Sequence, residues 1–314
     1  MIAGNGPTPR PTPAIEWLDW NAPVLRQAAE WLLNATKSSE GGVVTDTVDL
    51  RDTLCVTPGR RAGRRLLWHL EQAARDRRVQ LIPPDIVTPG EIASRTHPCR
   101  GPVARELECM AAWAAALTER GPDRAALGAA PAGDADRDDP LGRLFLAQEL
   151  VRLEDELAQY GRSWGEVRAA AQRLAGSAEA ERWAALERLA QDVRTRLQGA
   201  GLLHPVDAQR DAIHGHGASS STNDRHVIDA RPRQVVLIGV VELGMVARMA
   251  LTALGSMGGR VVALVHASPD ARGDFDAFGC VDAEAWSKRP LSITDEAIVV
   301  AGRAGDAAQA ALDI

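Results

Sequence analysis

Two nearly uninterrupted apolar runs, residues 235–240 (VVLIGV) and 260–266 (RVVALVH), constrain the fold of this chain more than any other feature. Strands that are apolar on both faces are typical of parallel sheets that helices cover on both sides. Residues 243–257, between the two runs, have the pattern of a helix. This strand-helix-strand order predicts an α/β fold with a parallel sheet.

A second strand-helix unit is predicted before residue 100. Residues 52–57 form a β-prone run that stops at Pro58 and Gly59, and residues 66–74 then repeat apolar side chains at helical spacing. Two short extended pieces, 81–82 and 86–87, follow. The next residues, TPGE, predict the start of a helix with proline in its first turn.

The N-terminal region is predicted to contain a disordered start followed by a helix. Residues 1–14 are rich in proline and are expected to be disordered. Residues 15–34 place apolar side chains, among them Trp17, Leu25 and Leu32, at helical spacing. This spacing predicts a helix that docks onto the rest of the protein.

A long stretch of helical period separates the two strand-containing regions. From about residue 101 to 212 the apolar period is 3.6, apart from a Gly, Ala and Asp-rich loop at 128–139. We therefore expect a discontinuous α/β domain, 15–100 and 230–314, and an all-helical insertion, 101–229, that ends in a flexible loop. A further strand is predicted at 297–301.

Charge and cysteine content limit the classes of function. The formal net charge is -6, so the protein as a whole does not attract nucleic acid, and any contact with DNA needs a local basic patch. The four cysteines are not spaced as ligands of zinc or of an iron–sulfur cluster. No signal peptide or membrane-spanning run is recognisable, so a cytoplasmic protein without a membrane partner is expected.

The densest functional signal is the segment TPGRRAGRRLLWHL, residues 57–70. It places four arginines, Arg60, Arg61, Arg64 and Arg65, in the first turns of a predicted helix. Cations there oppose the helix dipole by about 0.3 to 1 kcal/mol each. An anion such as a DNA phosphate, held where free N–H groups also point, would offset that cost. The alternative is a solvated surface in an arginine-rich protein.

Eight tryptophans against one tyrosine raise the question of base stacking. Trp17, Trp31, Trp113 and Trp183 lie on apolar helical faces, and we predict that they pack in cores. Trp68 lies beside the arginines and is the one stacking candidate.

No complete catalytic motif is recognisable. The turn from Gly59 to Gly63 lacks the spacing, lysine and hydroxyl of a phosphate loop, and no acidic pair follows the 235–240 strand. Asp85 and Glu91 have part of the spacing of a nuclease site, but the lysine is missing. The histidines between 204 and 226 are expected to be loop residues and not metal ligands. No hydrolase elbow or dinucleotide-binding motif follows a strand.

The order of several blocks resembles the N-terminal half of AddB-like proteins of the PD-(D/E)XK nuclease family. The blocks are TPGRRAGRRLL, LIPPDIVTPGEI, VVLIGVVEL and RVVALVHASPDARGDFDAFGCVDAEAW. The resemblance extends over nearly the whole chain from about residue 15. It implies a sheet of the P-loop NTPase or superfamily 1 helicase type that has lost its ATPase, with a helical subdomain inserted in it.

The resemblance also implies a role for the arginine segment. Thr57, Arg60, Arg61 and Arg64 match the part of related helicases that lies along single-stranded DNA. The expected partners are single-stranded or end DNA and an AddA-like helicase subunit. The family's exonuclease motif, its iron–sulfur cluster and its magnesium belong to a C-terminal nuclease domain, so this chain is expected to be a fragment or truncated product, without cofactors and without catalysis of its own.

Two other classes of function stay open from the sequence. A small-molecule transferase would use the ends of the 235–240 and 260–266 strands, with Glu242 and His266 as the residues to test. A structural, partner-binding protein would use the helical block as its interface.

Overall fold

A five-stranded parallel sheet organises one half of this computed structural model, which describes residues 13–35, 47–127, 140–174, 177–215 and 231–290. All four pairings between neighbouring strands are parallel. The strand order is β1-β7-β6-β3-β5. The strands are β1 (Ala14–Leu18), β3 (Thr53–Val56), β5 (Asp85–Val87), β6 (Gln234–Ile238) and β7 (Arg260–His266). Two further strands, β2 (Thr47–Asp49) and β4 (Gln80–Ile82), form a small parallel sheet.

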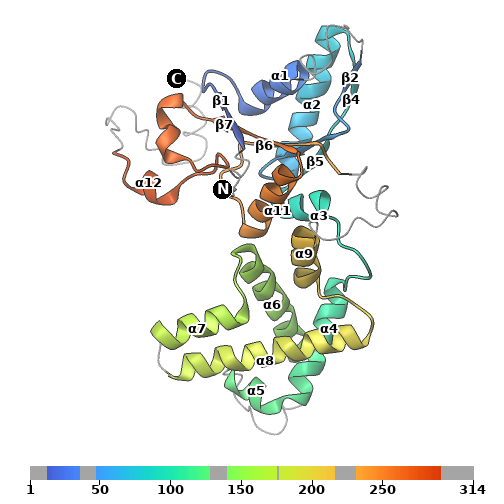
Figure 1. Cartoon of the computed structure of the whole chain (residues 1–314), viewed down its shortest axis with the longest axis vertical. Coiled ribbons are helices and arrows are strands. Elements are labelled where there is room, and N and C mark those ends of the chain that lie inside the picture. Colours follow the sequence, from blue (N-terminus) through green and yellow to red (C-terminus); the bar gives the residue numbers. More distant parts are fainter. Residues whose placement is uncertain (1–12, 36–46, 128–139, 175–176, 216–230, 291–314) are drawn as a thin grey trace, which may run out of the picture.

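Helices cover both faces of the five-stranded sheet (Figure 1). On one face, α1 (Val24–Ala35) and α2 (Arg60–Arg77) bury leucines such as Leu32 and Leu66 against β3, β6 and β7. On the other face, α3 (Ile92–Thr96) and α11 (Met245–Ser256) bury Ile92 and Leu251. This double coverage explains why the central strands are apolar on both faces.

The chain winds in opposite directions from the boundary between β3 and β6. β3 leads through α2 to β5 on one side, and β6 leads through α11 to β7 on the other. A crevice at the carboxyl ends of the strands, at such a change of direction, is the usual ligand site of an open α/β sheet. Thr57 follows β3 at this edge, and Gly239 follows β6.

A block of helices lies between β5 and β6 in the chain and packs around a core of its own (Figure 1). That core includes Trp113, Leu150, Leu189 and Val193. The block contacts the sheet region where α6 and α9 meet α11 and where α9 meets α3. Its helices are α4 (Glu106–Glu119), α5 (Gly121–Ala126), α6 (Pro140–Gln159), α7 (Trp164–Leu174), α8 (Ser177–Gly199) and α9 (Pro205–His214). The remaining short helices are η2 (Pro89–Glu91), η6 (Pro269–Asp274) and α12 (Ala283–Ser287).

One buried carboxylate joins four helices of this block. Glu154 on α6 is 5% exposed. Its Oε1 accepts hydrogen bonds from Trp164 Nε1 at 3.1 Å and from the Arg194 guanidinium at 2.9 Å. Its Oε2 lies 3.1 Å from His204 Nε2. Burial acts to raise the pKa of Glu154, but the bond to His204 and the charge of Arg194 outweigh it and hold the pKa below its usual value. Glu154 is therefore a charged group that depends on its partners.

Replacing Glu154 with alanine should destabilise the protein strongly, because it leaves Arg194, His204 and Trp164 without their shared acceptor. We expect the free energy of unfolding to fall by about 3 to 5 kcal/mol, measured by urea denaturation. Glu149→Ala on the same helix removes only an exposed ion pair to Arg152 and should change it by less than about 1 kcal/mol. Equal effects of the two substitutions would contradict this account.

The structure confirms the predicted α/β class with a parallel sheet and corrects three local predictions. Residues 15–18 belong to strand β1 and not to a helix, which begins only at Val24. Ala14, expected to be disordered, is the first residue of that strand. His204 and His214, expected to be loop residues, lie at the start and in the last turn of α9, and His204 is buried. The predicted loop 128–139, most of the loop before residue 230 and the predicted strand 297–301 lie outside the described residues.

Candidate functional site

The turn from β3 into α2 is held rigidly against β5. The Thr57 amide donates to the carbonyl of Val87 at 3.0 Å, and the buried Thr57 hydroxyl donates to the carbonyl of Gly59 at 3.2 Å. A Cβ on Gly63 would lie 2.9 Å from a methyl group of Ile86, so a glycine is needed there for the first turn of α2 to approach β5. Thr57 thus holds the start of α2 in place through its hydrogen bonds, and its buried side chain is not accessible to solvent.

The helix start presents four arginines to solvent. Arg60, Arg61, Arg64 and Arg65 are all exposed, and the first turn contains no acidic residue. Within the described part of the chain, no carboxylate lies within ion-pair distance of any of the four. The cap residue is Gly59, which has no side chain to accept from the first N–H groups of the helix. The positive end of the helix and the arginine charges therefore add up at one place.

Trp68 extends this surface by a further turn. Its side chain is 46% exposed, and the Arg65 guanidinium lies over its ring at 4.7 Å from the centroid. Arg60, Arg64 and Trp68 follow one another at intervals of four residues, so they form one ridge about 12 Å long on α2. Burial lowers the pKa of the neighbouring His69, and the charges of Arg65 and Arg26 lower it further. We call Arg60, Arg61, Arg64, Arg65 and Trp68 the α2 surface.

One carboxylate moderates the charge at the base of this surface. Glu91 accepts hydrogen bonds from the amide and hydroxyl of Thr88, which lower its pKa, and the nearby charge of Arg60 contributes to the same effect. Glu91 is therefore the cap of the turn after β5, and Asp85 pairs with Arg95 at 3.5 Å. Asp85 and Glu91, the two carboxylates whose spacing partly matches a nuclease site, therefore both have structural partners.

The loop after β1 occupies the same edge of the sheet, and its carbonyl groups are already bound. His266 Nε2 lies 3.1 Å from the carbonyl of Asp19 and 3.2 Å from that of Ala22. Facing two acceptors, this nitrogen must carry the proton. Trp20 Nε1 donates to the carbonyl of His266 at 2.9 Å, and Gln27 donates to that of Ala22 at 2.7 Å. The carbonyls of Asp19 and Ala22 are thus held by side chains of the protein itself.

Glu242 and His266, the two residues expected to form a transferase site, lie in different surroundings. Gly239 has a left-handed backbone (φ 58°), and Glu242 is exposed at the mouth of a cavity shared with α6 and α9. His266 is bound to the loop after β1 instead. Among the described residues, Glu242 and His266 share no hydrogen-bond partner. The geometry therefore gives no support to a transferase site in which both would act on one substrate.

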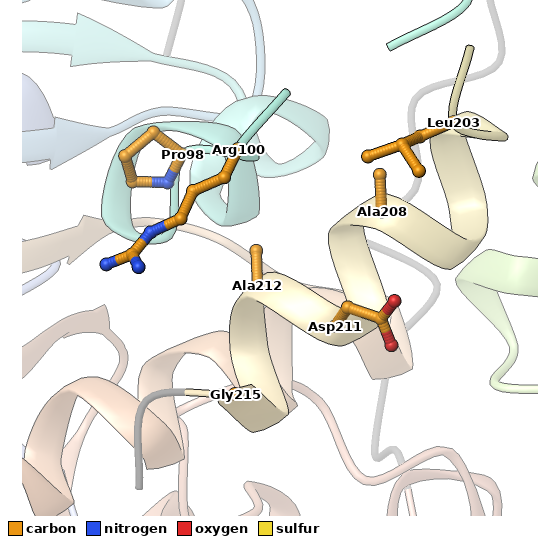
Figure 2. Close-up of a pocket in the computed structure, with 7 residues that line it drawn as sticks. All are labelled: Pro98, Arg100, Leu203, Ala208, Asp211, Ala212 and Gly215. Carbon is orange, nitrogen blue, oxygen red and sulfur yellow. The ribbon is translucent and has the colours of Figure 1, made fainter. Parts of the chain in front are cut away.

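A cavity of about 290 Å³ lies away from the α2 surface, between the segment after α3 and helix α9 (Figure 2). Arg100 and Asp211 belong to its walls, and Figure 2 shows that their charged groups do not face each other. The cavity brings together none of the residues that the sequence singled out.

Metal and thiol chemistry find little support among the described residues. No three of their His, Cys, Asp or Glu side chains are grouped as a metal site. All four cysteines are free thiols, and burial raises the pKa of Cys55 and Cys280 to about 12. These two therefore stay protonated at neutral pH.

No protein family matches this chain, and no curated protein shows a significant match to it. Among the helices of the described residues, none combines the length and the apolar character needed to cross a bilayer.

Arg61→Gln should make the isolated protein more stable, because it removes a cation that opposes the dipole of α2. We expect a gain of about 0.3 to 1 kcal/mol in the free energy of unfolding at low salt, and a smaller gain at high salt. Arg75→Gln, in the last turn of the same helix, should have the opposite sign. A loss of stability in Arg61→Gln would mean that this arginine has a structural partner.

Proposed function

We propose that this chain is the non-catalytic, helicase-like and DNA-engaging portion of a protein that processes the ends of double-strand breaks. In this proposal the α2 surface holds the backbone of single-stranded DNA. The observation that carries it is the position of four exposed arginines at the start of one helix, next to an exposed tryptophan; none of the four forms an ion pair with a carboxylate of the described residues.

The chemistry of the α2 surface suits a single strand. Phosphate oxygens are recognised by arginine side chains and by helix N-termini, and both lie together at Arg60 and Arg61. Trp68, farther along the same ridge, offers an aromatic ring on which a base stacks, with the Arg65 guanidinium over one face of that ring. A duplex keeps its bases stacked on one another, so the tryptophan favours unpaired DNA.

The topology supports the helicase-like part of the proposal. Without the short β5, the neighbouring strands β1, β7, β6 and β3 are the first, fourth, third and second of the chain, an order that resembles the core sheet of P-loop ATPases. In this reading residues 15–100 and 230–314 form the α/β domain, and 101–229 is a helical insertion. The likeness is one of fold alone and implies no activity.

The proposal includes the loss of ATP hydrolysis. The first strand of such a sheet would be followed by a phosphate-binding loop, and here the loop after β1 has its carbonyl groups bound by His266 and Gln27. The strand that would end in a metal-binding acidic pair ends at Ile238 and is followed by Gly239 and Val240. These substitutions support a module that binds DNA without turning over nucleotide.

The helical block supports a scaffolding role within the same proposal. Its surface exposes large apolar side chains, Leu107 on α4 with Leu144 and Phe145 on α6. Such side chains are typical of protein interfaces. An AddA-like helicase subunit is the partner we propose for this chain, and a nuclease domain with its metal and iron–sulfur cluster would act on the strand that this module guides.

Replacing Arg60, Arg61, Arg64 and Arg65 together with glutamine should weaken binding to an unstructured oligothymidylate by at least about tenfold. The dependence of the affinity on salt should also flatten by about 0.7 for each phosphate contact that is lost. Fluorescence anisotropy over a series of salt concentrations measures both quantities. Unchanged binding would remove the α2 surface from the proposal.

A matched control removes four positive charges from the helical block instead of from the α2 surface. Replacing Arg124, Arg152, Arg173 and Arg182 on the helical block with glutamine changes the net charge equally and should leave the affinity within about twofold, because only local contacts release counterions. If this control loses as much affinity as the α2 variant, the effect is one of net charge. Trp68→Ala should weaken binding of the single strand more than binding of a duplex.

A further inference from the structure

A second cavity lies at the junction of the sheet and the helical block. It has a volume of about 650 Å³, within the usual range of small-molecule sites. Four parts of the chain form its walls: the turn after β5 with α3, the end of α6, the start of α9, and the link from β6 into α11. It therefore lies just outside the carboxyl ends of parallel strands, where open α/β sheets bind ligands.

The charged groups in this cavity are all negative. Asp155 on α6 and Glu242 after β6 contribute carboxylates, and none of the described residues that line the cavity is a lysine, arginine or histidine. Within the described chain neither carboxylate has a hydrogen bond or an ion pair. Burial raises the pKa of Asp155, and the neighbouring charge of Glu154 raises it further, while His204 acts in the opposite direction. The site thus contains two carboxylates that form no hydrogen bond or ion pair with a cationic side chain of the described residues.

The remaining walls suit a short carbon chain with polar ends. Pro89, Ala93, Val206 and Ala247 give apolar surface, and Ser94 and Gln159 add polar groups near the rim. DNA is a poor occupant, because its phosphates would face two carboxylates. A molecule that carries positive charge on a small apolar body matches both the lining and the charge.

We propose that this cavity binds a small organic cation of the alkyl-amine class, with Asp155 and Glu242 as the residues that recognise its ammonium groups. This inference does not depend on DNA binding by the α2 surface. Because the cavity lies between α6, α9 and α11, a bound cation also contacts both the helical block and the sheet region. Binding should therefore stabilise their contact.

Calorimetric titration of the full chain with 1,4-diaminobutane tests the proposal, with 1,4-butanediol as the uncharged probe of the same length. We expect saturable binding of the diamine and none of the diol. Asp155→Asn and Glu242→Gln should each weaken diamine binding by at least about fivefold, the loss that corresponds to about 1 kcal/mol for an ion pair. Asp211→Asn, in the separate cavity of Figure 2, is the matched control and should bind as the unaltered protein does.

Three results would overturn the proposal: no saturable binding of the diamine, equal binding of the diol, or full affinity in the Asp155 and Glu242 variants. The urea midpoint of each variant shows whether it is folded. Val206→Trp places a large side chain on the cavity wall and should abolish binding without removing charge. Retained affinity in this variant would place the cation elsewhere.

Discussion

The structure depends on the parallel pairing of β3 with β6, which joins two parts of the chain that the helical block separates. Thr53, Leu54, Cys55 and Val56 lie opposite Gln234–Leu237 in register, and nearly every side chain at this boundary is buried on one face or the other. Strands buried on both sides cannot be exposed to water without losing much of the hydrophobic stabilisation. The pairing also sets where the winding of the chain reverses, and it thereby brings the residues after β3 and β6 to one edge of the sheet.

That edge of the sheet carries two turns with different hydrogen-bonding character. The turn after β3 is rigid because Thr57 and Gly63 are pressed against β5, so the arginines of α2 project from a fixed base. The loop after β1 is equally rigid, but its hydrogen bonds run inward, from His266 and Gln27 to backbone carbonyls. Arginines on a fixed helix start attract anions, and a loop whose carbonyls are bound inward does not. The proposed DNA binding and the proposed loss of ATP hydrolysis thus rest on two turns at the same edge of the sheet, separated by β7 and β6.

The sequence predicts the parallel sheet and the helix that begins at the arginine segment, and it fails where contacts are long-range. The runs at 235–240 and 260–266 carry enough apolar character to identify buried strands without any partner. Residues 15–18 do not, because four residues are too few to distinguish the period of a strand from that of a helix, and only pairing with β7 decides. His204 was predicted in a loop since its partner, Glu154, is on another helix. The roles of His266 and of Asp155 likewise depend on which helices and loops meet, and no local pattern reveals them.

The most direct test of the account is to locate where a single strand contacts the protein. An oligothymidylate that carries 5-iododeoxyuridine can be crosslinked by ultraviolet light to nearby aromatic side chains, and mass spectrometry of the digest identifies the modified peptide. The account predicts crosslinks to Trp68 in α2 that high salt suppresses and that the four arginine substitutions abolish. Crosslinks confined to the helical block, with Trp68 unmodified, would contradict it.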